Sequence, residues 1–346
     1  MTVRAFICGL SGPTLTGDEA AFLREAAPWG LILFKRNVDN PAQVKALTNE
    51  FRNIVGWDAP VLVDQEGGRV QRLSAPHWPV YPPGNAYAAA YEADSVRGLA
   101  AARLGGRLIG EDLRALGIDV DCIPVADVPI AGADAIIGDR AFGTTPEQVA
   151  TLAGAMAEGL RAAGVLPVLK HLPGHGRATA DSHLKLPVVD TDRATLEATD
   201  FAAFRPLADL PLGMTAHVVF SAIDAAAPAT TSAIMIREVI REWIGFSGLL
   251  MSDDVSMGAL SGTIAERSQA AIAAGCDLVL HCNGNLAEMR DVAGAVPKLA
   301  GAALERADRA LALRRGQGRF DVASARTEFA SLLDTQGNAP GSGTVA

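Results

Sequence analysis

The chain has 346 residues, of which 49% are hydrophobic and 20% are charged, and its formal net charge is −9. This composition supplies enough apolar side chains for a large buried core and excludes wholesale disorder. The acidic balance and the lack of a Lys/Arg cluster argue against a nucleic-acid partner, because phosphate binding needs a basic face.

Short apolar runs alternate with helical patterns along the chain. The runs typical of buried strands are residues 5–10, 31–36, 60–65, 120–125, 165–171, 212–219, 248–254 and 276–282. Helical periodicity separates them, for example at 42–55, 147–164, 233–244 and 265–275, and a last helix reaches about Arg315. Eight strands buried on both faces, each followed by a helix, predict an α/β fold of the (β/α)₈ TIM-type barrel class.

A single domain follows from the same pattern. The main competing fold is a doubly wound open sheet, but residues 1–315 contain no linker that would divide the chain into two such halves. We therefore expect one barrel domain over 1–315 and a C-terminal extension over 316–346. The Gly/Ser/Pro-rich end, 335–346, predicts a frayed tail.

The N-terminus and the cysteines bear on location. The apolar run in MTVRAFICGLSG is too short for the centre of a signal peptide, and no stretch reaches about 18 consecutive apolar residues. The four cysteines show no CxxC pairing or regular spacing: they are Cys8, Cys122, Cys276 and Cys282. Three of them sit in apolar runs, which is typical of small core residues in a reducing compartment. We expect a soluble cytoplasmic protein with no membrane partner.

Unusual polar residues gather where the predicted strands end, and catalytic groups of such barrels lie at these ends. Charges there would be costly to desolvate unless they served a cleft. Individual residues could instead cap helices or pair at the rim. The residues concerned are Asp64, Glu66, Arg69, Arg72, Asp139, Arg140, Lys170, His171, His217, Ser252, Asp253, Asp254, His281 and Asn283.

The segment KHLPGHGRATADSH, residues 170–183, holds three of the six histidines. A metal site could use His171, His175 and His183 with Asp181, since zinc favours His and carboxylate ligands. However, the spacing matches no HExxH-type helix. We expect His175, which lies between two glycines, to stabilise the turn.

The pair Asp181 and His183 suits acid–base catalysis. Residues two apart in an extended segment point to the same side, so Asp181 can accept one ring N–H and leave the other nitrogen facing a cleft. His183 is therefore a candidate general acid/base near neutral pH. Asp253 is a candidate nucleophile, and an aspartate nucleophile with a separate acid is the logic of retaining glycoside hydrolysis. Groups suited to holding sugar hydroxyls and an acetamide are Asp64, Arg72, Arg140, Lys170 and His171.

With these residues in view, the chain resembles the short, single-domain β-N-acetylglucosaminidases of glycoside hydrolase family 3. The resemblance extends from residue 5 to about 315. The motifs that carry it are VDQEGGRVQR (63–72), GDRAFG (138–143), KHLPGHG…DSH (170–183), MTAHV (214–218) and MSDDVSM (251–257).

The resemblance implies a role for each site residue. Asp253, and not Asp254, is implied to be the nucleophile, and His183 the acid/base held by Asp181. Asp64, Arg72, Arg140, Lys170 and His171 are implied to hold the non-reducing GlcNAc. No metal or organic cofactor belongs to this pattern, the partner is a small carbohydrate, and we expect a monomer. Many family members carry an acidic residue after the last Gly of KHxPGHG, where this chain has Arg177.

The implied process is cytoplasmic removal of GlcNAc from GlcNAc-1,6-anhydroMurNAc-peptides during cell-wall recycling. The same residues are compatible with further reactions. A neutral acid/base tolerates phosphate as the acceptor, which would make the protein a phosphorylase. Attack by the substrate's own acetamide would use Asp253 and Asp254 as a polarising pair. The chain could also be a β-glucosidase or β-xylosidase of the same family, a metal-dependent hydrolase or a non-catalytic sugar- or peptide-binding barrel.

Overall fold

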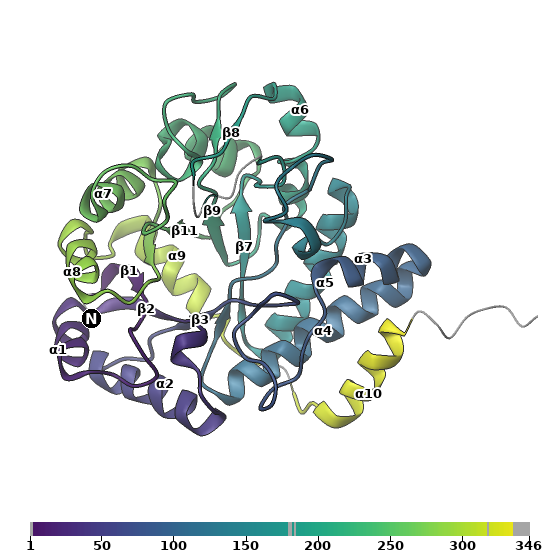
Figure 1. Ribbon diagram of the computed structural model, residues 1–346, viewed down its shortest axis with the longest axis horizontal. Helices are drawn as coiled ribbons and strands as arrows, with labels where there is room; N and C mark the ends of the chain where they lie inside the picture. Colours follow the sequence, from purple (N-terminus) through teal and green to yellow (C-terminus); the bar gives the residue numbers. More distant parts are fainter. Residues whose placement is uncertain (1–2, 179–181, 183–184, 317, 335–346) are drawn as a thin grey trace, which may run out of the picture.

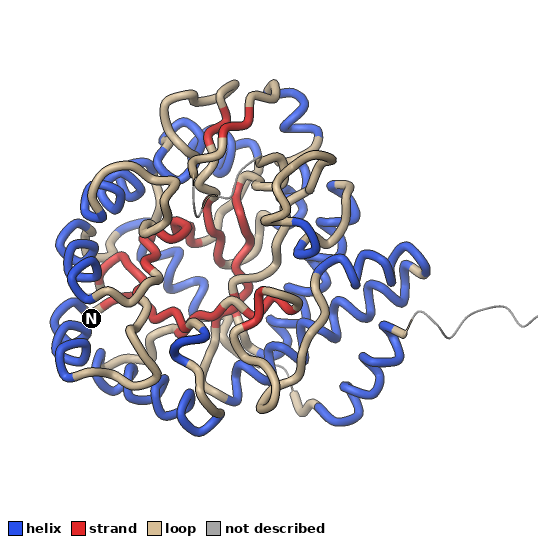
Figure 2. The backbone as a smooth tube through the Cα atoms, in the orientation of Figure 1, coloured by secondary structure: helices blue, strands red, loops and turns tan. Residues whose placement is uncertain are grey.

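A closed barrel of parallel strands forms the centre of the protein (Figures 1 and 2). The computed structural model describes residues 3–178, 182, 185–316 and 318–334. Within these residues the strands close in the order β1 (Arg4–Cys8), β12 (Leu278–His281), β11 (Leu249–Asp254), β9 (Leu212–Thr215), β7 (Leu166–Leu172), β6 (Val120–Asp121), β3 (Val61–Val63) and β2 (Pro28–Leu33). The predicted eight-stranded barrel is confirmed.

The strands are apolar because both of their faces are covered. Every residue of β2 and of β7 is buried. One face of such a strand packs inside the barrel and the other packs against helices, so neither face needs polar residues. The ring closes where β1 pairs with β12, with Phe6 opposite Val279.

Helices cover the outside of the barrel (Figure 1). Their ends follow the chain's capping residues: Thr16 and Glu19 form a capping box at one start, and Asn40 accepts a bond from the Gln43 N–H at the next. The principal helices are α1 (Gly17–Ala26), α2 (Pro41–Val55), α3 (Gly84–Ala93), α4 (Ser95–Ala115), α5 (Pro146–Ala163), α6 (Arg193–Ala198), the π-helix η5 (Met235–Trp243), α7 (Ile264–Ala274), α8 (Leu286–Ala295) and α9 (Gly301–Leu311).

Several strands are shorter than predicted, and two of them are interrupted. The strand predicted at 120–125 forms the short ladder β6 and then only a single bridge from Val125 to Lys170, because Pro124 has no N–H for a ladder. The strand predicted at 212–219 ends as β9, and β10 (Val219–Phe220) pairs with β8 (Val188–Val189) outside the barrel. Both interruptions bring loops to the carboxyl end of the barrel.

The described part of the C-terminal extension includes a helix, α10 (Val322–Leu333), which lies beside α4 in Figure 1. Arg326 Nη2 donates to Asp112 Oδ1 at 2.6 Å, and the Phe329 ring centroid is 6.2 Å from that of Tyr87. This helix therefore packs on the barrel's outer layer. Among the described residues, no helix combines the length and the apolar composition needed to cross a bilayer.

Candidate active site

A cavity of about 510 Å³ opens at the carboxyl ends of the barrel strands. Six of the predicted site residues line it: Asp64, Arg72, Arg140, Lys170, His171 and Asp253. Lys170 and His171 come from β7 and Asp253 from β11, whereas the other three lie in the segments that follow β3, β5 and β6. Asp181 and His183 lie outside the described residues, whereas Ser182 between them is described and lines the same cavity.

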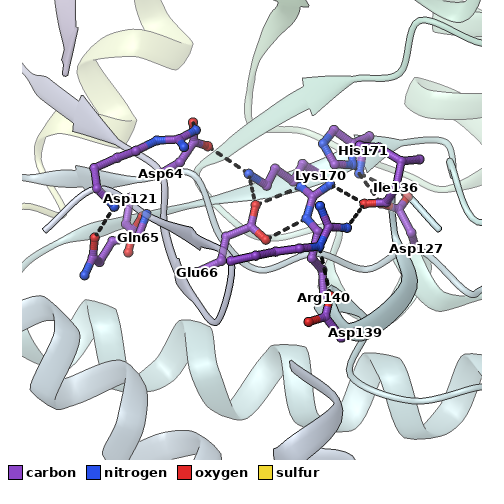
Figure 3. Close-up of polar contacts among 12 residues, drawn as sticks. Asp64, Gln65, Glu66, Asp121, Asp127, Ile136, Asp139, Arg140, Lys170 and His171 are labelled. Carbon is purple, nitrogen blue, oxygen red and sulfur yellow. Dashed lines mark hydrogen bonds and ion pairs between the residues drawn. The ribbon is translucent and has the colours of Figure 1, made fainter. Parts of the chain in front are cut away.

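Ion pairs connect most of these residues (Figure 3). Lys170 Nζ lies 2.9 Å from Asp64 Oδ1 and 2.6 Å from Glu66 Oε1. Arg140 binds both oxygens of Glu66, each at 2.8 Å, and Arg72 Nη2 lies 3.0 Å from Asp64 Oδ2. Three cations thus share two carboxylates, and such charge-assisted bonds fix the direction of each side chain.

The electrostatics keep Glu66, Asp64 and Lys170 charged. Burial alone would raise the pKa of Glu66, but Lys170 and Arg140 outweigh it and lower that pKa to about 2. Burial opposes ionisation of Asp64 in the same way, and Lys170 and Arg72 hold its pKa below the usual range. Burial likewise disfavours the Lys170 ammonium, yet the two carboxylates raise its pKa.

A β-hairpin places Glu66 and Arg72 at the cavity. It consists of β4 (Gln65–Gly67) and β5 (Val70–Gln71), directly after β3. Gly67 has a φ of 95°, and a Cβ there would lie 2.2 Å from the Pro82 carbonyl oxygen. Only glycine fits this turn, which explains the GG of the DQEGG motif.

His171 and His175 both contact one carboxylate, that of Asp127. His171 Nδ1 lies 2.7 Å from Asp127 Oδ2, and the His175 backbone N–H donates to Oδ1 at 2.6 Å. The His175 ring is buried, with Nε2 3.1 Å from Ser182 Oγ. Burial and the neighbouring His171 lower the pKa of His175 to about 4. These contacts fit the turn-stabilising role expected for His175.

The two aspartates that end β11 are held differently. Asp254 Oδ1 accepts bonds from the backbone N–H groups of Ser256 (2.9 Å) and Cys282 (3.1 Å), and its Oδ2 accepts from the Ser256 hydroxyl (2.7 Å). Asp253 Oδ1 accepts from the Asp254 N–H at 2.8 Å. Both residues line the cavity. The Asp254 carboxylate, however, already accepts hydrogen bonds from the backbone N–H groups of two other residues.

Two other histidines at strand ends have local partners. His217 bonds Thr230 Oγ1 through Nδ1 (2.7 Å), and its Nε2 lies 3.0 Å from the Asp254 carbonyl. His281 Nε2 lies 2.9 Å from Glu288 Oε2. Neither residue lines the cavity. In the described part of the chain, no group of three His, Cys, Asp or Glu side chains is placed to hold a metal ion.

Sequence reasoning missed the partners of the predicted residues. Glu66 was visible at a strand end, but its pairing with Lys170 and Arg140 was not predicted. Asp127 was not identified at all. The only signal for it was an acid directly after the apolar run 122–126. An acid in that position must find a donor when it is buried, so that signal could have marked it.

Comparisons with known proteins agree with the fold and with the motifs. Residues 13–312 match the family model described as the glycosyl hydrolase family 3 N-terminal domain. A beta-hexosaminidase of Methylococcus capsulatus is 44% identical over 278 residues, which are 79% of this chain and 81% of that protein. A beta-hexosaminidase of Alkalilimnicola ehrlichii is 41% identical over 287 residues, 82% of each chain.

Solved structures of NagZ from Neisseria gonorrhoeae have the same architecture. A zinc-ion complex superposes with a TM-score of 0.83 at 31% identity, covering 96% of this chain and 98% of that one. A complex with N-trifluoroacetyl-D-glucosamine gives a TM-score of 0.80 at 33% identity, covering 96% of this chain and 99% of that one. The similarity therefore extends over nearly the whole of both chains.

Proposed function

The chain belongs to glycoside hydrolase family 3, and from this premise we propose that it is a retaining exo-β-N-acetylglucosaminidase that removes non-reducing GlcNAc from peptidoglycan fragments. The observation that carries the proposal is the convergence of the predicted sugar-holding residues and Asp253 on one cavity. The beta-hexosaminidase relatives support the reaction, and the N-trifluoroacetyl-D-glucosamine complex of NagZ supports the sugar.

The charged network suits a sugar with several hydroxyls and an amide. Lys170 has three N–H donors, and among the described residues two carboxylates take two of them. Asp64 and Arg72 add an acceptor and further donors on the same wall. Because the ion pairs already orient these groups, the sugar does not have to order them when it binds.

In the first chemical step, the Asp253 carboxylate attacks the anomeric carbon while His183 gives a proton to the departing glycosidic oxygen. In the second, neutral His183 takes a proton from water, and the water oxygen displaces Asp253 from the same carbon. Two inversions retain the configuration. The resemblance supplies the roles of His183 and of Asp181, which would hold its ring.

The geometry favours Asp253 over Asp254 as the nucleophile. Three donors from the backbone and from Ser256 occupy the Asp254 carboxylate. Moving it toward a sugar would leave those partly buried donors unpaired, at up to about 1–3 kcal/mol each. Asp254 is therefore better suited to hold the end of β11 in place, and Asp253 lies in the same strand.

For the biological role we propose cytoplasmic recycling of GlcNAc-1,6-anhydroMurNAc-peptides, with the protein acting as a monomer. The family resemblance supports the substrate. Cys8, Cys122, Cys276 and Cys282 are free thiols and all buried, which supports a reducing compartment.

The proposal is tested by comparing an aryl β-GlcNAc with an aryl β-glucoside, each with and without chelator and with and without phosphate. We expect hydrolysis of the GlcNAc glycoside, retention of configuration, no effect of the chelator and no sugar-1-phosphate. Preference for the glucoside would identify a β-glucosidase, and sugar-1-phosphate would identify a phosphorylase. Loss of activity with the chelator would identify a metal-dependent hydrolase. The chelator is included because one similar NagZ structure is a zinc complex. Binding without turnover would leave only a sugar-binding barrel.

A further inference from the structure

Asp127 is a fully buried carboxylate directly behind the cavity wall. It follows β6, has no exposed surface and does not line the cavity. Neither the sugar nor the reacting atoms can touch it. An isolated buried carboxylate would be strongly destabilising, so its position requires that its partners be essential to the fold or to the site.

Its hydrogen-bond partners among the described residues come from the end of β7 and from the loop that follows it. The carboxylate receives the backbone N–H of His171 at 3.3 Å and that of His175 at 2.6 Å, both on Oδ1. The other oxygen, Oδ2, lies 2.7 Å from His171 Nδ1. Figure 3 shows the His171 ring and Asp127 side by side, next to Lys170.

The charge of Asp127 determines which ring nitrogen of His171 carries a proton. Burial would raise the pKa of Asp127, but the contacts with His171 and His175 outweigh it and hold that pKa below its usual value. An ionised carboxylate is only an acceptor, so His171 Nδ1 must be the donor. In neutral His171 the other nitrogen, Nε2, is then an acceptor on a ring that lines the cavity.

The chain around Asp127 also supports the segment after His171. The Ile130 N–H donates to the Gly176 carbonyl at 3.4 Å, and the Asp134 N–H donates to the Ala178 carbonyl at 2.9 Å. A Cβ on Gly176 would lie 2.0 Å from the Val128 carbonyl oxygen, so only glycine permits this close approach. Residues 127–134 therefore run along 175–178, and Asp127 anchors one end of the contact.

We propose that Asp127 is the positioning residue of the sugar site: it fixes the Nδ1–H tautomer of His171, so that Nε2 accepts a hydrogen bond from a sugar hydroxyl. This inference rests on the proposed function, in which His171 holds GlcNAc. It adds a buried residue that acts on the ligand through His171.

The test uses Asp127→Asn, which keeps the shape and the Oδ1 acceptor for both backbone N–H groups. Its side-chain NH₂ then faces His171 Nδ1, so the ring proton must move to Nε2. We expect ¹⁵N NMR to show a protonated Nδ1 in wild-type His171 and a protonated Nε2 in the variant. The ring signals of His171 are assigned as those that disappear in the His171→Gln variant. We also expect the Asp127→Asn variant's dissociation constant for GlcNAc to rise about 10- to 100-fold, by analogy with the loss of a carboxylate that orients a metal-binding histidine.

Asp119→Asn is the matched control. Asp119 is also a largely buried aspartate that accepts a backbone N–H, from Val61 at 2.8 Å, but it precedes β6 and so lies at the opposite end of that strand. We expect this variant to keep the wild-type tautomer and GlcNAc affinity. If it weakens binding as much as Asp127→Asn does, the effect is general destabilisation and the proposal is wrong.

The wild-type protein alone can also overturn the inference. Neutral His171 with its proton on Nε2 would contradict the tautomer, even if Asp127→Asn does not fold. Unchanged GlcNAc affinity in a folded Asp127→Asn variant would contradict the positioning role. Neither measurement needs turnover. Failure of the wild type to hydrolyse aryl β-GlcNAc would therefore refute the proposed function separately, without deciding the tautomer.

Discussion

Lys170 Nζ lies 2.9 Å from Asp64 Oδ1, although the two residues are 106 positions apart in the chain and β6 lies between their strands. The same ammonium is 2.6 Å from Glu66 Oε1. Lys170 thus neutralises two carboxylates that would otherwise repel each other in a buried wall. The contact joins the segment after β3 to the end of β7, and all three residues line the cavity.

Replacing Lys170 with Met should therefore weaken the fold as well as the site. The two carboxylates would keep only their arginine partners, and breaking a buried ion pair costs about 3–5 kcal/mol. We expect the free energy of unfolding, measured with urea, to fall by about 3 kcal/mol and hydrolysis of aryl β-GlcNAc to be lost. Lys45→Met, at an exposed position on α2, should change stability by less than about 0.5 kcal/mol. Equal effects of the two substitutions would contradict this account.

Replacing Asp253 with Ala should remove turnover while the fold is kept, because the residue supplies the proposed nucleophile. We expect kcat for aryl β-GlcNAc to fall by about three orders of magnitude or more. A fluorosugar should label wild-type Asp253 covalently, as peptide mass spectrometry would show. Asp254→Asn is the comparison: it should lose stability and keep the label on Asp253. Absence of any label would favour attack by the substrate's acetamide.

His175 should make the folded protein sensitive to mild acid. Burial and His171 lower its pKa from 6.5 to about 4. Below about pH 6.5 the His175 side chain is therefore protonated in the unfolded chain, whereas in the folded chain it stays neutral down to about pH 4. Stability is then full above pH 6.5 and decreases down to about pH 4, by on the order of 3 kcal/mol. Urea unfolding at pH 7 and pH 4.5 measures the loss. His175→Gln should lose stability less steeply, whereas His77→Gln, at an exposed position, should follow the wild type. Parallel curves for all three proteins would exclude this contribution.

Arg177 stands where the resemblance leads us to expect an acidic residue, and the structure gives it a partner. Its Nε lies 2.6 Å from Asp200 Oδ2, and its Nη2 donates to Thr199 Oγ1 at 3.0 Å. Asp200 is buried, and burial raises its pKa. We expect Arg177→Glu to lower the free energy of unfolding by about 3 kcal/mol, because it would set a second carboxylate against this one.

A double-mutant cycle isolates the Arg177–Asp200 pair. The single variants Arg177→Ala and Asp200→Ala and the double variant should give a coupling energy of about 1 kcal/mol or more in urea unfolding. A coupling below about 0.3 kcal/mol would mean that the pair contributes no more than independent sites do.

The barrel could be predicted because its signal is local and repeated. Each strand is a short apolar run and each helix a periodic one, so an error at one boundary, such as the early end of β6 at Asp121, does not change the count. The rim residues could be predicted for a related reason. In a parallel barrel the carboxyl ends of all strands lie at the same end of the barrel. A barrel fold therefore places Lys170 and Asp253, which lie at strand ends, at the same opening.

The sequence by itself determined the fold class, the family and the set of charged residues at the barrel mouth, because these depend on periodicity and on motifs read along the chain. Only the tertiary structure decided which charges neutralise one another. It set Lys170 between Asp64 and Glu66 and His171 against Asp127, since such contacts depend on which strands are neighbours in space. The physical reason is that burial makes an unpaired charge costly, and the partner that removes this cost can come from any strand that the barrel brings near.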